Sequence, residues 1–148
     1  MKPYLIGIDL GGTNIKAGIF DEDFKVIKAL SIPTEATEGS SHVLHRIRAA
    51  IDLLTEGSDV SMDLIKGMGI GIPGLLDPVE GLSIFSPNFP DWDHVHIINE
   101  MKDYYDFPVF IDNDVRVNLY GEWLHGAGRG FNNIVLITLG AGLGAGSI

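Results

Sequence analysis

The chain has 148 residues, which fits one domain or one domain with the start of a second. Hydrophobic residues make up 45% and charged residues 20%, which excludes a disordered tail, and the net charge of −10 argues against nucleic acid as a partner. Cysteine is absent, so disulfides, thiolate metal sites and cysteine nucleophiles are excluded within these residues. Because the sequence shows neither a signal peptide nor an apolar run of roughly 18 residues, we expect a soluble, cytoplasmic protein without a membrane partner.

Three apolar runs in the first part of the chain predict a three-stranded meander over residues 4–10, 15–20 and 26–32. The segment 40–54 then predicts an amphipathic helix, with Ser40 or Ser41 as N-cap and Gly57 just past its end. Its apolar side chains recur at steps of three and four: Val43, Leu44, Ile47, Ala50, Ile51 and Leu54.

The rest of the chain alternates strands and helices, which indicates α/β architecture with a mixed sheet. A strand is expected at 64–72, followed by a loop to about residue 95 that is rich in Pro, Gly, Asn and Asp and long enough to be functional or mobile. The later elements are expected as helices at 97–105 and 113–125 and strands at 107–111, 133–139 and 144–148. Gly126–Gly130 is the candidate hinge or domain boundary.

Glycine accounts for 19 residues, about 13% against a usual 7% or so, and it is clustered. The first cluster lies in the turn between the first two expected strands and has the chemistry of a phosphate-binding loop. Glycines allow backbone amides to approach an anion, hydroxyl and amide side chains add donors, and a carboxylate can hold Mg²⁺. The alternative is an ordinary hairpin turn, which Asp9, Thr13 and Lys16 make less attractive. The residues of this candidate phosphate loop are Asp9, Gly11, Gly12, Thr13, Asn14 and Lys16.

Asn113 and Asp114 lie where an expected strand meets an expected helix. Side chains at the carboxyl end of a strand face a crevice, and Asp114 is suited to accept a proton from an attacking hydroxyl. Both residues are also favoured helix caps, and the residues alone leave the two interpretations open. In the preceding loop, Gly74 and Asn88 suit a polyol ligand, since Asn88 can both donate and accept hydrogen bonds.

The last glycine cluster, at 140–146, also satisfies the dinucleotide pattern G-x-G-x-x-A after a strand. That pattern needs a following helix and an acidic residue about 20 positions later, and the chain meets neither condition. We therefore interpret Gly140 and Gly142 as part of a second phosphate loop.

Five ordered motifs give the chain a specific resemblance. The segment GIDLGGTNIKAGIFD, at 7–21, resembles the first phosphate motif of the actin-like ATPase-fold sugar kinases and, among them, the ROK family of repressors, open reading frames and kinases. Three further segments agree in order, and the final glycine cluster resembles the second phosphate loop: GIGIPGLLDPVEG at 69–81, SPNFPDW at 86–92 and DNDVRVNLYGEW at 112–123.

The resemblance implies an α/β, actin-like ATPase (ribonuclease H-like) fold, with residues 1–126 as an N-terminal lobe and 127–148 as the hinge and first hairpin of a second lobe. It implies ATP-dependent phosphorylation of a glucose-like hexose, with ATP and Mg²⁺ as cofactors and Asp9 as a metal ligand. The implied phosphate-binding residues are Asp9, Gly11, Gly12, Thr13, Asn14, Lys16, Gly140 and Gly142. The implied sugar-binding residues are Gly74, Asn88, Asn113 and Asp114, with Asp114 as the catalytic base.

Several positions depart from the family pattern: Asp112 stands for Glu, Val115–Arg116 for Ala-Asn, Asp91 for Gly and Ala141 for Thr. The family's Glu-x-Gly-His motif, cysteine-rich zinc motif and adenosine pocket would lie after residue 148. We therefore expect the isolated chain to be inactive and to need a missing C-terminal lobe or a homo-oligomer. A non-catalytic sugar-binding or interaction module is the open alternative, whereas a repressor is disfavoured because no helix-turn-helix precedes the first motif.

Overall fold

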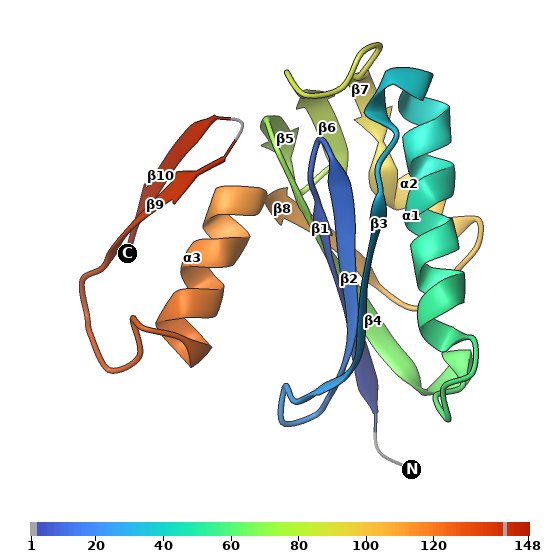
Figure 1. Ribbon diagram of the computed structural model, residues 1–148, viewed down its shortest axis with the longest axis horizontal. Coiled ribbons are helices and arrows are strands. Elements are labelled where there is room, and N and C mark those ends of the chain that lie inside the picture. The colour runs from blue at the N-terminus through green and yellow to red at the C-terminus, as the bar shows by residue number, and fades with distance from the viewer. Residues whose placement is uncertain (1–2, 141) are drawn as a thin grey trace.

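In a computed structural model of the protein, which describes residues 3–140 and 142–148, five strands form a mixed sheet in the order β3-β2-β1-β4-β8 (Figure 1). The first three strands pair antiparallel in sequence, which confirms the predicted meander. The other two strands extend the sheet parallel to β1. The bounds are Tyr4–Leu10 for β1, Asn14–Asp21 for β2, Val26–Pro33 for β3, Ile65–Ile72 for β4 and Val109–Asn113 for β8.

Helix α1, Ser40–Thr55, covers one face of this sheet, and all six apolar residues of the predicted stripe are buried. Their side chains pack against the inward-facing residues of β1 and β2 in one continuous core. The predicted N-cap was wrong, because Gly39 precedes the helix and no side chain caps it. Gly39 has a φ of 94°, a left-handed value that suits glycine, so the helix is entered through Gly39, one residue before Ser40 and two before Ser41.

The segment expected as a long loop contains a small antiparallel sheet, so the expectation of a loop without strands was wrong. Strands β5, Leu75–Asp77, β6, Leu82–Phe85, and β7, Asp93–His96, pair in the order β5-β6-β7. Each strand is only three or four residues long and is bounded by turn residues, which hides the alternation that identifies longer strands. Phe89 and Trp92 form its buried local core, with ring centroids 4.9 Å apart.

Asp91 in this segment adopts a φ of 56°. The left-handed region favours glycine, and aspartate is among the residues that tolerate it best. This φ value explains why the family pattern has glycine at position 91 and why aspartate is tolerated there.

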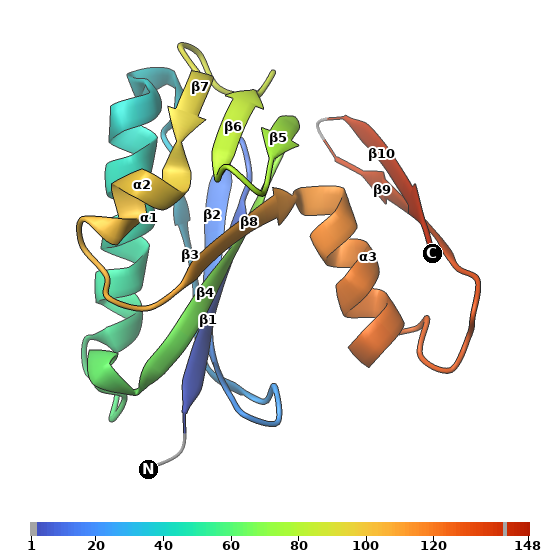
Figure 2. The same cartoon turned by 180° about the vertical axis from the view of Figure 1, so that it is seen from behind.

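The sheet lies between α1 and α2 on one side and α3 on the other, as Figures 1 and 2 show from opposite directions. Helix α2, Ile97–Lys102, is shorter than expected, and α3 spans Asp114–His125. The 3₁₀ helices η1 and η2 span Ala36–Glu38 and Met62–Leu64. No helix in the described part of the chain is long and apolar enough to cross a membrane.

Strands β9, Val135–Leu139, and β10, Leu143–Ser147, form a separate two-stranded sheet on the far side of α3 from the main sheet (Figures 1 and 2). Glycines let β10 approach α3 closely, since a Cβ added at Gly144 would lie 2.5 Å from a methyl group of Val115. The candidate hinge, Gly126–Gly130, folds back on the end of α3, where the Gly126 and Gly128 amides both donate to the carbonyl of Glu122. Ala141 lies outside the described residues.

The exposed apolar side chains of this hairpin lead to a prediction about self-association. Isolated two-stranded hairpins are marginally stable, and apolar edges pair with other chains. Although the hairpin packs on α3, we expect its exposed apolar strands to pair between molecules, with self-association at high concentration in static light scattering. The large side chains concerned are Val135, Ile137, Leu139 and Leu143, which are 74%, 61%, 85% and 75% exposed.

A chain ending at Gly130 is the control and should remain monomeric. If both chains are monomeric and the hairpin amides are well protected from hydrogen exchange, the hairpin is stable within a single molecule and the prediction is wrong.

Candidate functional site

Three parallel strands end at one edge of the main sheet and bring the predicted polar residues together. The register pairs Asp9 of β1 with Gly71 of β4, and Gly71 with Asp112 of β8. One residue further, Ile72 pairs with Asn113. The carboxyl ends of neighbouring parallel strands are where ligands bind in α/β folds. This edge is therefore the candidate site.

The β1–β2 loop, Gly11–Thr13, is closed by a hydrogen bond of 3.0 Å from the Gly11 amide to the Asn14 carbonyl. A Cβ at Gly11 would lie 2.8 Å from that carbonyl oxygen, so the tight closure requires glycine. Neither Gly11 nor Gly12 has a positive φ. Glycine is therefore favoured at both positions because a Cβ would crowd a neighbouring atom, and not because of the backbone dihedral angles. The amides of Gly12 and Thr13 donate to no acceptor among the residues that the structure describes, which leaves two donors for an anion.

Asp9 is the half-buried carboxylate of this edge. Burial raises its pKa above 3.8, Lys16 opposes the shift from 4.0 Å away, and the negative charge of Asp114 adds to it. A Cβ on Gly71 would lie 3.5 Å from the Cα of Asp114, an ordinary contact distance, so the start of α3 packs directly on the end of β4. Two carboxylates thus share one region, in which a cation would be favoured.

Asn113 is the N-cap of α3, as one of the two interpretations of this pair predicted. Its side-chain oxygen accepts from the amides of Val115 and Arg116 at 3.0 and 3.4 Å, and its side-chain nitrogen donates to the carbonyl of Gly74 at 3.2 Å. Asp114 is the first residue of the helix, and one of its carboxylate oxygens accepts from the Val115 amide. The other oxygen accepts no hydrogen bond from any described residue and is free to act on a ligand.

Asn88 lies directly beside the β1–β2 loop. A Cβ on Gly12 would be 3.2 Å from the Cβ of Asn88, so the two loops are in close contact across the site. Gly74 is required for packing, since its φ is 107° and a Cβ there would overlap the carbonyl oxygen of Phe85. The structure therefore brings Asn88, Gly12, Gly74 and Asn113 into one connected cluster.

Two positions that depart from the family pattern pair with each other. Arg116 Nη1 lies 3.4 Å from Asp112 Oδ1, which also accepts from the Asn113 amide at 2.7 Å. The arginine side chain is 58% exposed, so the ion pair contributes little stability, about 0–1 kcal/mol. Its structural consequence is that Arg116 leans back along the first turn of α3 toward Asp112.

Gly140 and Gly142 are the predicted site residues that are not joined to this cluster. They close the β9–β10 turn through a bond of 2.9 Å from the Gly140 amide to the Gly142 carbonyl. A Cβ on either residue would meet no atom within 4 Å. The space beside their backbone is therefore accessible to a ligand or to a further protein segment.

A groove of about 570 Å³ runs from the candidate site along the open face of the sheet. Asp9 and Lys16 lie at the site end, and small residues of the neighbouring strands form its floor: Gly7, Ala17, Gly18 and Ala29.

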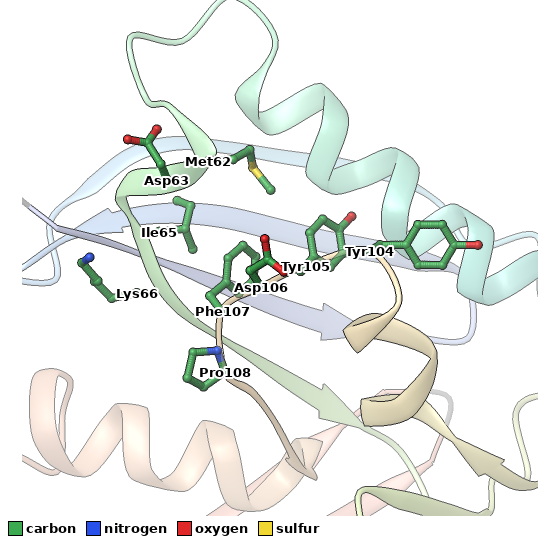
Figure 3. Close-up of a pocket in the computed structure, with 9 residues that line it drawn as sticks. All are labelled: Met62, Asp63, Ile65, Lys66, Tyr104, Tyr105, Asp106, Phe107 and Pro108. Carbon is green, nitrogen blue, oxygen red and sulfur yellow. The ribbon is translucent and has the colours of Figure 1, made fainter.

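A second cavity, of about 450 Å³, lies at the amino end of β4, roughly 23 Å of strand away from the site (Figure 3). Tyr105 and Phe107 stack within its wall with ring centroids 5.2 Å apart. Burial raises the pKa of Tyr105 to about 12, so its hydroxyl stays protonated. The cavity is separate from the cluster at the other end of the strands.

Thr34 is a residue that the sequence analysis did not identify. It follows β3, is fully buried, and its hydroxyl donates to the carbonyl of Gly11 at 2.6 Å. A single threonine between Pro33 and an acidic residue carries no periodic or motif signal. Only the fold reveals that it contacts the β1–β2 loop.

Known proteins resemble this chain over its whole length. The glucokinase of Thermotoga maritima is 39% identical over 147 residues, which cover 99% of this chain and 45% of that protein. The solved structure of a ROK family glucokinase from Streptomyces griseus in complex with glucose and AMPPNP has a TM-score of 0.85 and 34% identity, covering 98% of this chain and 44% of that one. A xylose repressor of Bacillus subtilis is 28% identical over 147 residues, 98% of this chain and 37% of that protein.

These similarities show that the mixed α/β structure is the actin-like ATPase fold, as predicted. Residues 5–148 match the ROK family, and the chain belongs to it. The chain spans less than half the length of these relatives. Because glucokinases and a repressor both occur among them, family membership alone does not distinguish an enzyme from a regulator.

The raised pKa of Asp9 predicts how its removal changes stability. The folded chain keeps this proton to a higher pH than the unfolded chain does, so stability is lost as pH rises above 3.8 through the raised folded value. Asp9→Asn removes this loss. We expect the variant to melt at a higher temperature than the unsubstituted chain at pH 7 and at the same temperature near pH 3.

Thermal unfolding followed by circular dichroism between these pH values measures the difference. Asp59→Asn, which neutralises an exposed carboxylate outside the site, controls for the change in net charge. Equal melting shifts for the two variants at every pH would show that Asp9 destabilises the folded chain no more than an exposed carboxylate does.

A substitution at Gly12 tests the contact between the two loops. Gly12→Val places a branched side chain against Asn88, and overpacking of this kind costs about 1–3 kcal/mol. We expect a lower free energy of unfolding in urea and displaced side-chain amide resonances of Asn88. Gly69→Val is the matched control, since a Cβ at this position of β4 meets no atom within 4 Å. An unchanged Asn88 resonance in Gly12→Val would show that the loops do not touch.

Proposed function

We propose that this chain is the N-terminal lobe of an ATP-dependent hexose kinase, with residues 1–126 as that lobe and 127–148 as the hinge and start of a second lobe. The observation that carries the proposal is the single edge at which Asp9, the β1–β2 loop, Asn88 and Asp114 meet. The glucokinase relatives, one of them solved with glucose and AMPPNP, support a glucose-like sugar and ATP as the two substrates.

The nucleotide phosphates bind at the β1–β2 loop. The free amides of Gly12 and Thr13 are oriented donors, and Thr13 and Asn14 add exposed side-chain donors. Lys16 supplies a positive charge at the same edge. Gly140 and Gly142 form the second phosphate loop; the Gly140 amide closes its turn, and the Gly142 amide, which donates to no acceptor among the described residues, is the available donor.

The residues at this edge fit a magnesium ion bound together with phosphate. No group of three or more His, Asp or Glu residues in the described part of the chain forms a complete metal site. Mg²⁺ commonly takes one or two protein carboxylates and fills its remaining positions with water and substrate phosphates, and Asp9 provides such a carboxylate. When bound, the ion neutralises charge on the transferring phosphoryl group.

The sugar binds against Asn88, Asn113 and the Gly74 turn. Asn113 keeps one amide hydrogen for a hydroxyl, because its side-chain oxygen caps α3 and its nitrogen donates once to Gly74. The free carboxylate oxygen of Asp114 accepts the proton of the attacking hydroxyl as the sugar oxygen bonds to the γ-phosphorus; the bond from that phosphorus to the β,γ-bridging oxygen breaks, and ADP leaves. Holding the hydroxyl and the base together is the main contribution of this lobe.

The base assignment is tested in a chimaera that joins residues 1–148 to the part of Thermotoga maritima glucokinase beyond the matched region. We expect the chimaera to phosphorylate glucose and Asp114→Asn to lower kcat by at least about 10²-fold, with KM for glucose within severalfold. Asp112→Asn, a carboxylate in the same turn that pairs with Arg116, should lower kcat less than tenfold or so.

Two results separate the alternatives. Nearly unchanged turnover in Asp114→Asn would reject this residue as the base. A chimaera that binds glucose by calorimetry but never phosphorylates it would favour a non-catalytic sugar-binding module. The 148-residue chain alone should show no sugar-dependent ATP turnover, because the adenosine pocket would lie in the second lobe.

A further inference from the structure

Thr34 bonds to the β1–β2 loop at two points. Its hydroxyl donates to the Gly11 carbonyl at 2.6 Å, and its amide donates to the Thr13 carbonyl at 2.9 Å. The residue is completely buried. A buried hydroxyl with a short bond to a loop carbonyl fixes that carbonyl firmly, since breaking the bond leaves an unsatisfied group out of reach of water.

The bond to Gly11 also determines where one loop amide points. In a planar trans peptide the carbonyl and the following N–H point in opposite directions. Because Thr34 holds the Gly11 carbonyl toward the core, the Gly12 amide is directed away from the core. This is one of the two amides that donate to no acceptor among the described residues.

Helix α1 holds the segment around Thr34 from the other side. Arg46 Nε donates to the carbonyl of Pro33 at 3.0 Å and lies 3.7 Å from the carboxylate of Glu35. His42 Nε2 lies 2.6 Å from the same carboxylate. Thr34 therefore lies between Pro33 and Glu35, which both contact side chains of α1, so the position of Thr34 is fixed.

We propose that Thr34 is a positioning residue that fixes the β1–β2 loop and orients its Gly12 amide for a nucleotide phosphate. The inference rests on the proposed function, because it assigns the phosphate to the same loop. Thr34 touches no substrate and acts only through Gly11 and Thr13.

The test uses the ¹⁵N-labelled 148-residue chain and inorganic tripolyphosphate with Mg²⁺ as the probe. Thr34→Val keeps the side-chain shape and removes the hydroxyl. We expect it to weaken tripolyphosphate binding about tenfold, the effect of one lost hydrogen bond. Thr34→Ser, which restores the donor, should bind within about twofold of the unsubstituted chain. The Gly12 and Thr13 amides should shift on binding, and the shift of the Gly12 amide should be smaller in Thr34→Val.

Thr55→Val is the matched control, because the Thr55 hydroxyl also donates to main-chain carbonyls, those of Ile51 and Asp52, at the far end of α1. It should leave tripolyphosphate binding unchanged. Unweakened binding by Thr34→Val, or equally weak binding by Thr34→Ser, overturns the role of Thr34 while the phosphate site stands. If the unsubstituted chain shows no shift of the loop amides, the proposed nucleotide site fails and the role of Thr34 fails with it.

Discussion

The parallel alignment of β1, β4 and β8 is the constraint on which the site depends. Since these strands run in the same direction, Asp9, Gly71 and Asp112 lie in one row and the turns that follow them meet at one edge. Gly71 is the smallest member of the row, and the first residue of α3, Asp114, packs directly against it. The rise in the pKa of Asp9 is a direct consequence, because burial and a second carboxylate both disfavour its charge.

Local patterns predicted most of the elements but few of the contacts between them. The meander and α1 follow from apolar spacing, which is a property of each segment alone. Strands β5 to β7 were missed because three or four residues carry too little periodicity. The site residues Asp9, Asn113 and Asp114 were predicted from their places at strand ends. The contact of Gly12 with Asn88 and the bond from Thr34 to Gly11 join residues more than 20 positions apart, and no local pattern encodes them.

The sequence alone left helix capping and ligand binding at Asn113 as alternatives. In the structure the two roles are compatible. The side-chain oxygen caps α3 while the nitrogen bonds to Gly74, and one hydrogen remains. The cap fixes the side chain, and a fixed side chain holds its remaining donor in a defined direction. Asp114, as the next residue, starts the helix at a point set by that cap.

Some polar groups at this edge are hydrogen-bonded within the chain and others are not, which suits a ligand site. The supporting groups, Thr34 and Asn113, are hydrogen-bonded to the backbone, whereas the exposed groups retain unused capacity. Ionisation of Asp9 costs folding stability because its pKa is raised, two loop amides donate to no described acceptor, and one oxygen of Asp114 accepts from no described residue. Polar groups that fold without partners are stabilised when a ligand supplies them. An anion at the loop and a cation beside Asp9 would satisfy opposite charges at one place, which is the arrangement that a magnesium-bound phosphate presents.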